Sequence, residues 1–374
     1  MSTNWPFKKR YAELWVKTDM SKILIKNGKV WDGERFYFAD VLTDNEKISK
    51  IADKIDEAAE FEYDASGKIV SAGLVDIHVH MKGLASEKFG IEPNMSSFPF
   101  GVTAVNDAGS AHGDRELLDS FAVKNTVFVG VDVRDNHANF TVTEKLLKKY
   151  GDKAIGVKVY FDTTLTEVSD IAPLKEICDY AKSRNLKVMV HCSNSPTSMA
   201  EIVDTLSAGD ILTHIYHRGE NSCTENDFEA FKLAKQKGVV MDAGFAGHVH
   251  TDFCNFKKAI KCGFLPDTIS TDITRLSAYT RGGRYGMTMC MSMAKAVDVC
   301  EEDIFKSVTS SPAKALDKEN EWGYLKVGKS ADIAVFDYID EAFDLTDKAG
   351  NRFKNNMGYR CVLTVSDGQI VYRN

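Results

Sequence analysis

The chain has 374 residues, which exceeds the roughly 100–200 residues of a typical domain and allows one large domain with a smaller satellite. Its hydrophobic (44%) and charged (27%) residues are in ordinary globular proportion, which excludes disordered, collagen-like, coiled-coil and disulfide-scaffold proteins. The 47 lysines and arginines stand against 54 aspartates and glutamates, giving a net charge of −7. Because this leaves no overall basic field, neither nucleic acid nor a membrane surface is an expected partner.

We expect neither export nor membrane insertion. The first twenty residues contain charges throughout and lack the apolar stretch of a signal peptide, and no window approaches the roughly 18 apolar residues of a membrane span. The eight cysteines are scattered without CxxC pairs and are interpreted as reduced thiols. These features predict a cytoplasmic protein in which residues 1–20 form an N-terminal extension of undetermined role.

The chain shows two kinds of hydrophobic pattern, one after the other. Residues 21–72 alternate apolar and polar positions in short runs with Asn-Gly and Asp-Gly turn signals, as in a small β-structure. From residue 73 onward, apolar strand-like runs alternate with longer helix-like segments, which is typical of βα units around a parallel sheet. Eight strands close a barrel, and the eight runs here are LVDIHVH (74–80), GVTAVNDAG (101–109), TVFVGVDV (126–133), AIGVKVY (154–160), KVMVH (187–191), DILTH (210–214), VVMDAG (239–244) and TISTD (268–272).

Helix-like segments lie between and after these runs, with Thr, Ser or Asp near several starts and Gly after several ends. They span residues 173–184, 197–209, 225–238, 251–263, 284–299 and 311–316. Near the C-terminus the sequence pattern is again typical of strands. The predicted fold class is therefore α/β, with a (β/α)8 TIM barrel over residues 73–319 and a small β-sandwich domain built from residues 21–72 and 320–374.

Several histidines fall where predicted barrel strands end. The first strand ends in His78 and His80, and residues two apart point to the same face of a strand, here into the barrel near its C-terminal mouth. A pair of hydrogen-bonded core histidines would give the same pattern. However, the fifth and sixth strands also end in histidine, at His191 and His214, and the eighth ends in Asp272. Four strands that deliver metal-ligand side chains to one face favour a metal site.

Lys158 belongs to the same set because it lies between two valines of the apolar fourth strand. A buried charge without a partner is costly, so one interpretation is a lysine paired with an acid inside the barrel mouth. The other interpretation is that burial depresses its pKa and leaves a neutral amine. Such an amine can react with carbon dioxide to form a carbamate, an anionic ligand able to bridge two metals.

The residues at these strand ends resemble those of a known enzyme superfamily. The string GLVDIHVH, with Lys158, His191, His214 and Asp272 at successive strand ends, resembles the amidohydrolase superfamily, metal-dependent hydrolases that include dihydroorotase, hydantoinase and allantoinase. The C-terminal GYLKVGKSADIAVFD is similar to the segment that closes the satellite sheet there, so the resemblance runs from about residue 21 to the end. The segments GVKVY, VHCSNSP, ILTHIYHRG and ISTDIT are most similar to the dihydroorotase-like subgroup often labelled amidohydrolase/deacetylase.

The resemblance implies a binuclear centre and a mechanism. One metal would be held by His78, His80 and Asp272, the other by His191 and His214, with N6-carboxylysine at Lys158 bridging them. Two zinc ions suit these ligands, although manganese, iron or nickel would also fit. The resemblance further implies that a hydroxide bridging the metals attacks the carbonyl carbon, with Asp272 as general base and then general acid.

Three assignments are open on the residues themselves. Asp76 shares the inward face of the first strand. It either orients the metal ligands by a hydrogen bond or forms only a structural hydrogen bond at the bottom of the barrel. In LTHIYHRG, His214 closes the strand and is taken as the ligand, whereas His217 lies in the following loop as a candidate substrate contact. A second HxH, formed by His248 and His250, sits in a Gly-flanked loop and is interpreted as substrate-facing or lid-forming rather than as a third metal site.

The loops that follow barrel strands supply the substrate pocket, and here they are polar. The candidate substrate-binding residues are Asn194, His217, Arg218, His248 and Arg275. Guanidinium groups beside a metal centre suit a carboxylate or other anionic group, although a salt bridge within the loops would also explain each arginine. The predicted substrate is therefore a small anionic N-acyl or O-acyl compound.

The leading hypothesis is hydrolysis of an amide or ester bond of a small molecule, most simply as a deacetylase. A cyclic-amide hydrolase of the dihydroorotase or hydantoinase type is the alternative, because the same metals would serve it equally well. A deaminase is a weaker choice, since such relatives resemble a mononuclear pattern without the bridging lysine. A non-enzymatic scaffold is disfavoured because all six ligand positions are filled. The resemblance also allows a homo-oligomer.

Overall fold

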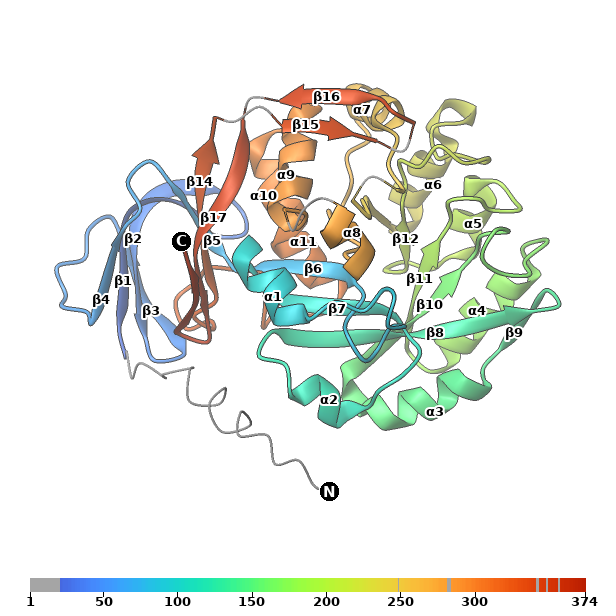
Figure 1. Cartoon of the computed structure of the whole chain (residues 1–374), viewed down its shortest axis with the longest axis horizontal. Coiled ribbons are helices and arrows are strands. Elements are labelled where there is room, and N and C mark those ends of the chain that lie inside the picture. Colours follow the sequence, from blue (N-terminus) through green and yellow to red (C-terminus); the bar gives the residue numbers. More distant parts are fainter. Residues whose placement is uncertain (1–20, 248, 281–283, 341–342, 348, 356) are drawn as a thin grey trace, which may run out of the picture.

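The computed structural model describes residues 21–374 apart from 248, 281–283, 341–342, 348 and 356. The predicted N-terminal extension (1–20) and His248 therefore lie outside the described residues. Two sheets dominate the fold, one in the predicted barrel and one made from both ends of the chain (Figure 1).

The barrel consists of seven regular parallel strands whose spatial order follows the chain. These strands are β6 (Leu74–Val79), β7 (Val102–Ser110), β8 (Lys124–Arg134), β10 (Ala154–Tyr160), β11 (Lys187–His191), β12 (Ile211–Thr213) and β13 (Val240–Asp242). A short strand, β9 (His137–Asn139), pairs with β8 as an addition that the sequence pattern did not reveal. Because parallel neighbours need crossover connections, each barrel strand must be followed by a return path over the outside.

The eighth place in the ring is filled by residues 268–273, where the sequence predicts a regular strand over 268–272. This segment instead joins its neighbours through single bridges, Asp242 to Thr268 on one side and Val79 to Ile273 on the other. Asp272 interrupts the extended backbone because its φ is 46°, in the left-handed region. The bridges still close the curled parallel sheet, and together with its outer helices this sheet confirms the predicted α/β barrel.

Helices cover the outside of the barrel, with α3 to α6 lying along β8 to β12 in Figure 1. The α-helices are α1 (Pro93–Ser97), α2 (Arg115–Asp119), α3 (Thr141–Tyr150), α4 (Ala172–Ser183), α5 (Met199–Thr205), α6 (Glu229–Lys237), α7 (Phe253–Lys261), α8 (Arg275–Thr280), α9 (Met287–Ala296), α10 (Glu301–Val308) and α11 (Ser310–Ala315). Helix α9 is buried on nearly all sides, since residues 287–294 are all buried. Among the described residues, no helix combines the length and apolarity needed to cross a bilayer.

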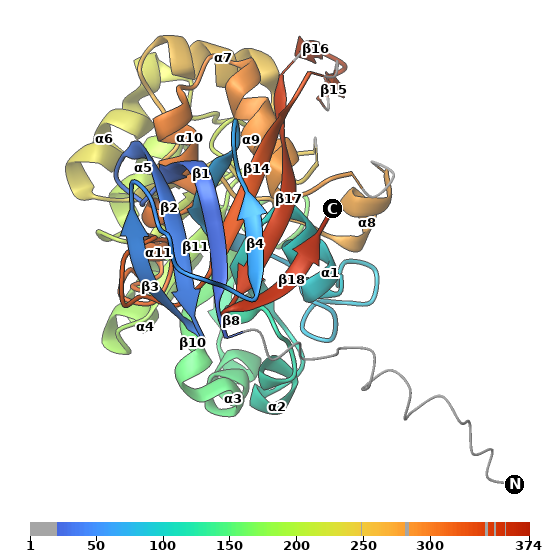
Figure 2. The same cartoon turned by 90° about the vertical axis from the view of Figure 1, so that its left-hand side faces the viewer.

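Both ends of the chain contribute to the second sheet, whose order is β18-β17-β14-β5-β1-β2-β3 with β4 beside β1 (Figure 2). Its strands are β1 (Ile23–Trp31), β2 (Phe36–Asp44), β3 (Lys47–Ala52), β4 (Phe61–Asp64), β5 (Ile69–Ala72), β14 (Ile333–Ile339), β17 (Gly358–Ser366) and β18 (Gln369–Arg373). The N-terminal and C-terminal parts meet where β5 pairs antiparallel with β14. Apolar residues from both parts, among them Val30, Val70 and Leu363, form one core.

A two-stranded hairpin, β15 (Phe343–Thr346) and β16 (Arg352–Asn355), extends from this C-terminal part. It is anchored to the barrel because Asp347, in its turn, accepts a 2.9 Å hydrogen bond from the backbone N–H of Phe253 at the start of α7. The hairpin thereby touches the connection that follows the seventh barrel strand. All eight cysteines are unpaired in the structure.

Candidate metal centre

One group of donor atoms comes from β6 and the eighth barrel segment. His78 and His80 alternate along the strand end, and both face Asp272. The Nε2 atoms of His78 and His80 lie 3.4 and 2.9 Å from Asp272 Oδ1, and all three side chains are buried. One ligand atom from each residue lies within 4.8 Å of the other two, so the group could hold a cation. We name this set the first donor group.

Asp76 holds the eighth segment in place from behind the first donor group. Its carboxylate accepts hydrogen bonds from the Thr271 hydroxyl (2.6 Å) and the Thr271 backbone N–H (3.1 Å). Burial raises the pKa of Asp76 to about 7, against the lowering effect of these hydrogen bonds. Of the two roles expected for Asp76, the structure shows contact with the residue next to Asp272, which fixes where Asp272 leaves the barrel wall.

Lys158 is completely buried in β10. Among the described residues, its hydrogen-bonding partner is His78 Nε2 at 3.2 Å, and it forms no ion pair with a carboxylate. Burial lowers the pKa of Lys158 to about 8, although the charges of Asp272 and Asp242 act in the opposite direction. An amine with this pKa is still mostly protonated at pH 7, but its neutral fraction is far larger than that of an ordinary lysine, which favours the interpretation as a reactive amine over a simple salt bridge.

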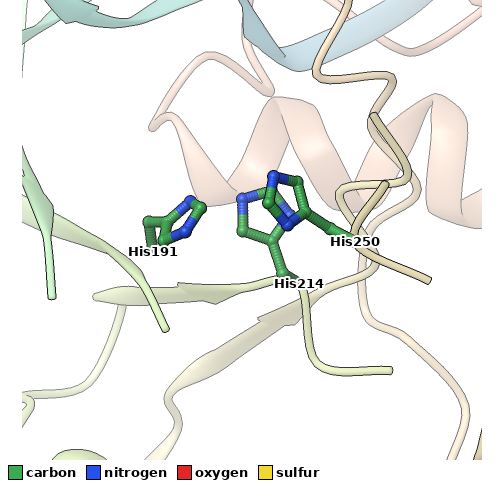
Figure 3. A group of neighbouring side chains, drawn as sticks. All are labelled: His191, His214 and His250. Carbon is green, nitrogen blue, oxygen red and sulfur yellow. The ribbon is translucent and has the colours of Figure 1, made fainter. Parts of the chain in front are cut away.

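A second donor group contains His191 at the end of β11, His214 directly after β12, and His250 from the loop before α7 (Figure 3). Ligand atoms of these three imidazoles also lie within 4.8 Å of one another. The two donor groups adjoin, since His214 Nε2 is 3.9 Å from Asp272 Oδ2 and the His78 and His214 ring centroids are 5.2 Å apart. The structure thus brings together all six residues predicted as metal ligands and adds His250.

Oxygen atoms next to the predicted ligands hold the imidazoles in place. His191 Nε2 lies 3.1 Å from Asp162 Oδ2, and His214 Nδ1 lies 2.7 Å from the carbonyl oxygen of Gly244. His78 Nδ1 lies 3.2 Å from the Thr213 hydroxyl, which itself donates to Asp242. Metal-binding histidines are commonly held in this way through the ring nitrogen that does not bind the metal.

Asp162 was not predicted from the sequence, and its carboxylate contacts His191 of the second donor group. Burial would raise its pKa, but hydrogen bonds from His191, Thr164 and Asn194 outweigh burial and hold the pKa well below its ordinary value. A signal existed, because Asp162 follows the fourth barrel strand by two residues, where polar residues face the mouth. His250 carried a weaker signal, since its HxH pattern with His248 lies in a loop and not directly after a barrel strand.

The chemistry of the two groups fits divalent metal ions. Burial lowers the pKa of His78, His191 and His214, so these imidazoles are neutral, the form that binds metals. His214 Nε2 is buried and finds no hydrogen-bond partner among the described residues, a costly arrangement for a polar atom unless a ligand completes it. His214 also has a left-handed φ of 66°, and strain of this kind gathers at functional sites.

The predicted substrate-binding residues have different surroundings. The Asn194 amide donates to Asp162, and His217 is buried with Nδ1 accepting a hydrogen bond from the Gly219 backbone N–H. The Arg218 side chain is 72% exposed and its Nε lies 3.9 Å from Asp252. Arg275 is exposed, with a 3.4 Å hydrogen bond to the Glu87 carbonyl oxygen. The prediction for His248 concerns a residue outside the described part of the chain.

The Amidohydrolase family model matches residues 69–371. A deacetylase of Agrobacterium fabrum is 29% identical over 335 residues, covering 82% of this chain and 79% of that protein. A deacetylase of Enterococcus faecalis is 28% identical over 376 residues, covering 93% and 98%. A crystal structure of a dihydroorotase superposes with a TM-score of 0.81 at 23% identity, covering 95% of this chain and 98% of the other.

Proposed function

The chain belongs to the amidohydrolase family, and from that premise we propose that this hydrolase deacylates a small anionic molecule, cleaving an amide or ester bond at two divalent metal ions. Deacetylases among its relatives support this reaction. The observation that carries the proposal is the pair of adjoining donor groups with the buried Lys158 amine beside them. Lys158 acts electrostatically on imidazoles of both groups, which fits a residue shared between two metals.

We propose zinc as the metal, since imidazole and carboxylate are ligands that zinc favours. His78, His80 and Asp272 would hold one ion, and His191 and His214 would hold the other. When bound, two such ions lower the pKa of a water molecule held at the site and polarise the scissile carbonyl group.

Lys158 would serve both ions as a carbamate. The neutral Nζ attacks the carbon of carbon dioxide, a new N–C bond forms, and one proton leaves to solvent. The product is an N6-carboxylysine with one negative charge and two ligand oxygens. This chemistry is supported by the complete burial of Lys158 and by its imidazole partner, because no carboxylate among the described residues forms an ion pair with the amine.

Asp272 is the proposed proton carrier. Burial would raise its pKa, but the neighbouring His78 and His80 outweigh burial and keep the pKa well below its ordinary value, so the group is a carboxylate at neutral pH. Its position against both donor groups, 2.9 Å from His80 and 3.9 Å from His214, suits a base that takes a proton from the attacking water. The same proton would then pass to the leaving nitrogen or oxygen.

His217 is a candidate contact for the anionic group of the substrate. Its Nδ1 accepts a hydrogen bond, so in the neutral ring the proton is on Nε2, and this buried N–H has no hydrogen-bond partner in the described part of the chain. Burial lowers the pKa of His217 to about 4, which keeps the ring neutral. Arg218, the next residue in the chain, is exposed and could also contact the anionic group, although nearby Asp252 offsets part of its charge.

The test is metal analysis followed by a substrate panel on metal-loaded protein. We expect two metal ions per chain and release of the acyl group from N-acetyl amino acids or O-acetyl hydroxy acids. Fewer than two ions would contradict the binuclear centre. Ring opening of dihydroorotate or a hydantoin without any deacylation would replace the proposal with the cyclic-amide alternative.

We also propose that the protein works in the cytoplasm, since eight unpaired cysteines, three of them exposed, suit a reducing compartment. A homo-oligomer stays a prediction from the family resemblance, and light scattering on the purified chain tests it.

A further inference from the structure

We propose that His250 is a third imidazole ligand in the second donor group, so that His191, His214 and His250 together hold one metal ion. This inference rests on the proposed function, because it takes metal binding at the second donor group as given. It concerns a loop residue beyond the strand-end ligands, and it changes how strongly the second metal depends on Lys158.

The three rings already converge. Ring centroids are 4.5 Å apart for His191 and His214, 4.1 Å for His214 and His250, and 4.8 Å for His191 and His250 (Figure 3). Zinc-to-nitrogen bonds of about 2.0–2.1 Å in a tetrahedral site put ligand nitrogens roughly 3.4 Å apart. The ligand atoms here lie within 4.8 Å of one another, so a modest closure around an ion completes the geometry.

Each of the three rings is held through one nitrogen by an oxygen atom. Asp162 contacts His191 Nε2 and the Gly244 carbonyl contacts His214 Nδ1. The Ser193 hydroxyl lies 2.8 Å from His250 Nδ1. A metal-ligating histidine typically donates its other N–H to such an oxygen, which assigns the metal to Nδ1 of His191 and to Nε2 of His214 and His250.

His217 provides the contrast, because it is a neighbouring histidine that is more deeply buried than His250 and has the opposite hydrogen-bonding polarity. Its Nδ1 accepts a hydrogen bond from the Gly219 N–H instead of facing an oxygen. His217 is also absent from the converging group formed by the other three imidazoles. Burial alone therefore does not produce the pattern seen at His250.

Hydrogen bonds hold described residues on both sides of His250. Before it, the Ala246 backbone N–H donates to the Thr271 carbonyl, which ties the loop to the eighth barrel segment. After it, the Asp252 backbone N–H donates to the Tyr216 carbonyl. Asp252 also caps α7, whose first N–H is held by Asp347. A loop anchored in this way can present His250 at a defined place.

The consequence is that the second metal has three protein ligands without Lys158. Three protein ligands and one open position are the usual set of a catalytic zinc site. A centre with only His191 and His214 would instead need the Lys158 carbamate to retain its metal. The two arrangements therefore predict different metal contents when Lys158 is replaced.

The experiment measures metal ions per chain by elemental analysis during titration with a chelator, together with the visible spectrum of the cobalt-substituted protein. The variants are His250→Ala, Ser193→Ala, Lys158→Met and Lys158→Met with His250→Ala, and the control is His137→Ala, whose side chain is 75% exposed. Circular dichroism checks that each variant is folded. Loss of a group behind a ligand costs about 10–100-fold in metal affinity, and loss of a ligand should cost more.

We expect His250→Ala to lower the affinity for one of two ions by more than about 100-fold and to change the cobalt spectrum, with Ser193→Ala giving a smaller, about 10–100-fold loss. Lys158→Met should keep an ion at the second donor group that the double variant loses. If wild-type protein binds two ions and His250→Ala binds both with wild-type affinity and spectrum, His250 is not a ligand. If wild-type protein itself fails to bind two ions, the proposed function is wrong and this inference falls with it.

Discussion

The two donor groups are supported differently. The first takes His78, His80 and Asp272 from the barrel wall, where β6 and the eighth segment are hydrogen-bonded to each other. The second takes His191 and His214 from strand ends but also includes His250, whose loop is held by α7 and, through Asp347, by the C-terminal hairpin. The barrel alone can shape the first group, whereas the second depends on parts added around it. Changes outside the barrel should therefore affect the second group selectively.

The largest effect is expected from Asp272→Asn, which breaks the first donor group and removes the proposed base. Loss of a general acid–base residue typically lowers a rate by about 10²–10⁴-fold, and we expect kcat for deacylation to fall within that range. The second donor group should keep its ion, because its three imidazoles are unchanged. Kinetics on an acyl substrate and metal analysis measure the two effects.

The matched control is Asp53→Asn, which changes an exposed carboxyl group in the same way. Wild-type kcat in Asp272→Asn would remove Asp272 from the mechanism, and loss of both ions would show that the donor groups are not independent.

Gly244→Ala should disturb the second donor group next most strongly. Gly244 has a φ of 51°, and a Cβ there would clash with the Thr213 hydroxyl and approach within 2.7 Å of His214 Nδ1. We expect a loss of about 1–3 kcal/mol from overpacking, with a further ~1–2 kcal/mol from the left-handed backbone, and weaker metal binding at the second group. Thermal unfolding and chelator titration provide the measurements.

Gly263→Ala is the control that separates backbone strain from the steric clash expected in Gly244→Ala. Gly263 also has a positive φ, 83°, but a Cβ there meets nothing within 4 Å. This control should lose only the strain contribution and keep wild-type metal affinity. Equal losses in the two variants would mean that the contact between Gly244 and His214 does not matter.

The difference between the groups also explains what the sequence could predict. His78, His80, His191 and His214 follow or end apolar runs, and strand periodicity with barrel topology is enough to bring such positions together. Lys158 was recognisable because a lysine within an apolar strand conflicts with its surroundings. Local pattern therefore predicted the barrel and six candidate ligand residues, five of them at predicted strand ends and Lys158 within a strand.

His250 could not be predicted in this way because its position depends on distant anchors. Tyr216 and Asp347 hold its loop, and Asp347 is 94 residues from the α7 residue that it contacts. The hairpin around Asp347 and the irregular eighth segment were missed for the same reason, since their pairing comes from tertiary contacts and not from periodicity. We interpreted the HxH around His250 as a lid or substrate contact, whereas the structure puts His250 beside two predicted ligands.

Asp162→Asn should weaken the second donor group with little effect on the fold. The carboxylate holds His191 Nε2, and an amide is a poorer acceptor that can also present its NH₂ to the ring. We expect about 10–100-fold weaker binding of one ion, with the ion at the first donor group as an internal control. Chelator titration resolves the two ions, and equal weakening of both would argue that Asp162 acts on the whole barrel instead of on His191.

The smallest effect is expected at Asp347, the most remote support of the second group. Burial opposes ionisation of Asp347, but hydrogen bonds from the Asn351 side chain and from the backbone N–H groups of Phe253, Asn351 and Ala349 outweigh it and lower its pKa. Because the folded-state pKa lies below the unfolded value of about 3.9, the carboxylate stabilises the fold above that pH, and this stabilisation is lost as the pH falls through the folded-state pKa. Asp347→Asn should therefore lower the free energy of unfolding by about 1 kcal/mol at pH 7, and the difference from wild type should shrink toward pH 3. Urea unfolding of both proteins across this pH range measures the difference, with Asp53→Asn as the exposed control. A difference that stays constant with pH would show that Asp347 acts through shape instead of charge.

If the hairpin supports His250 through α7, the Asp347→Asn variant should also show a small loss of metal affinity at the second donor group and none at the first.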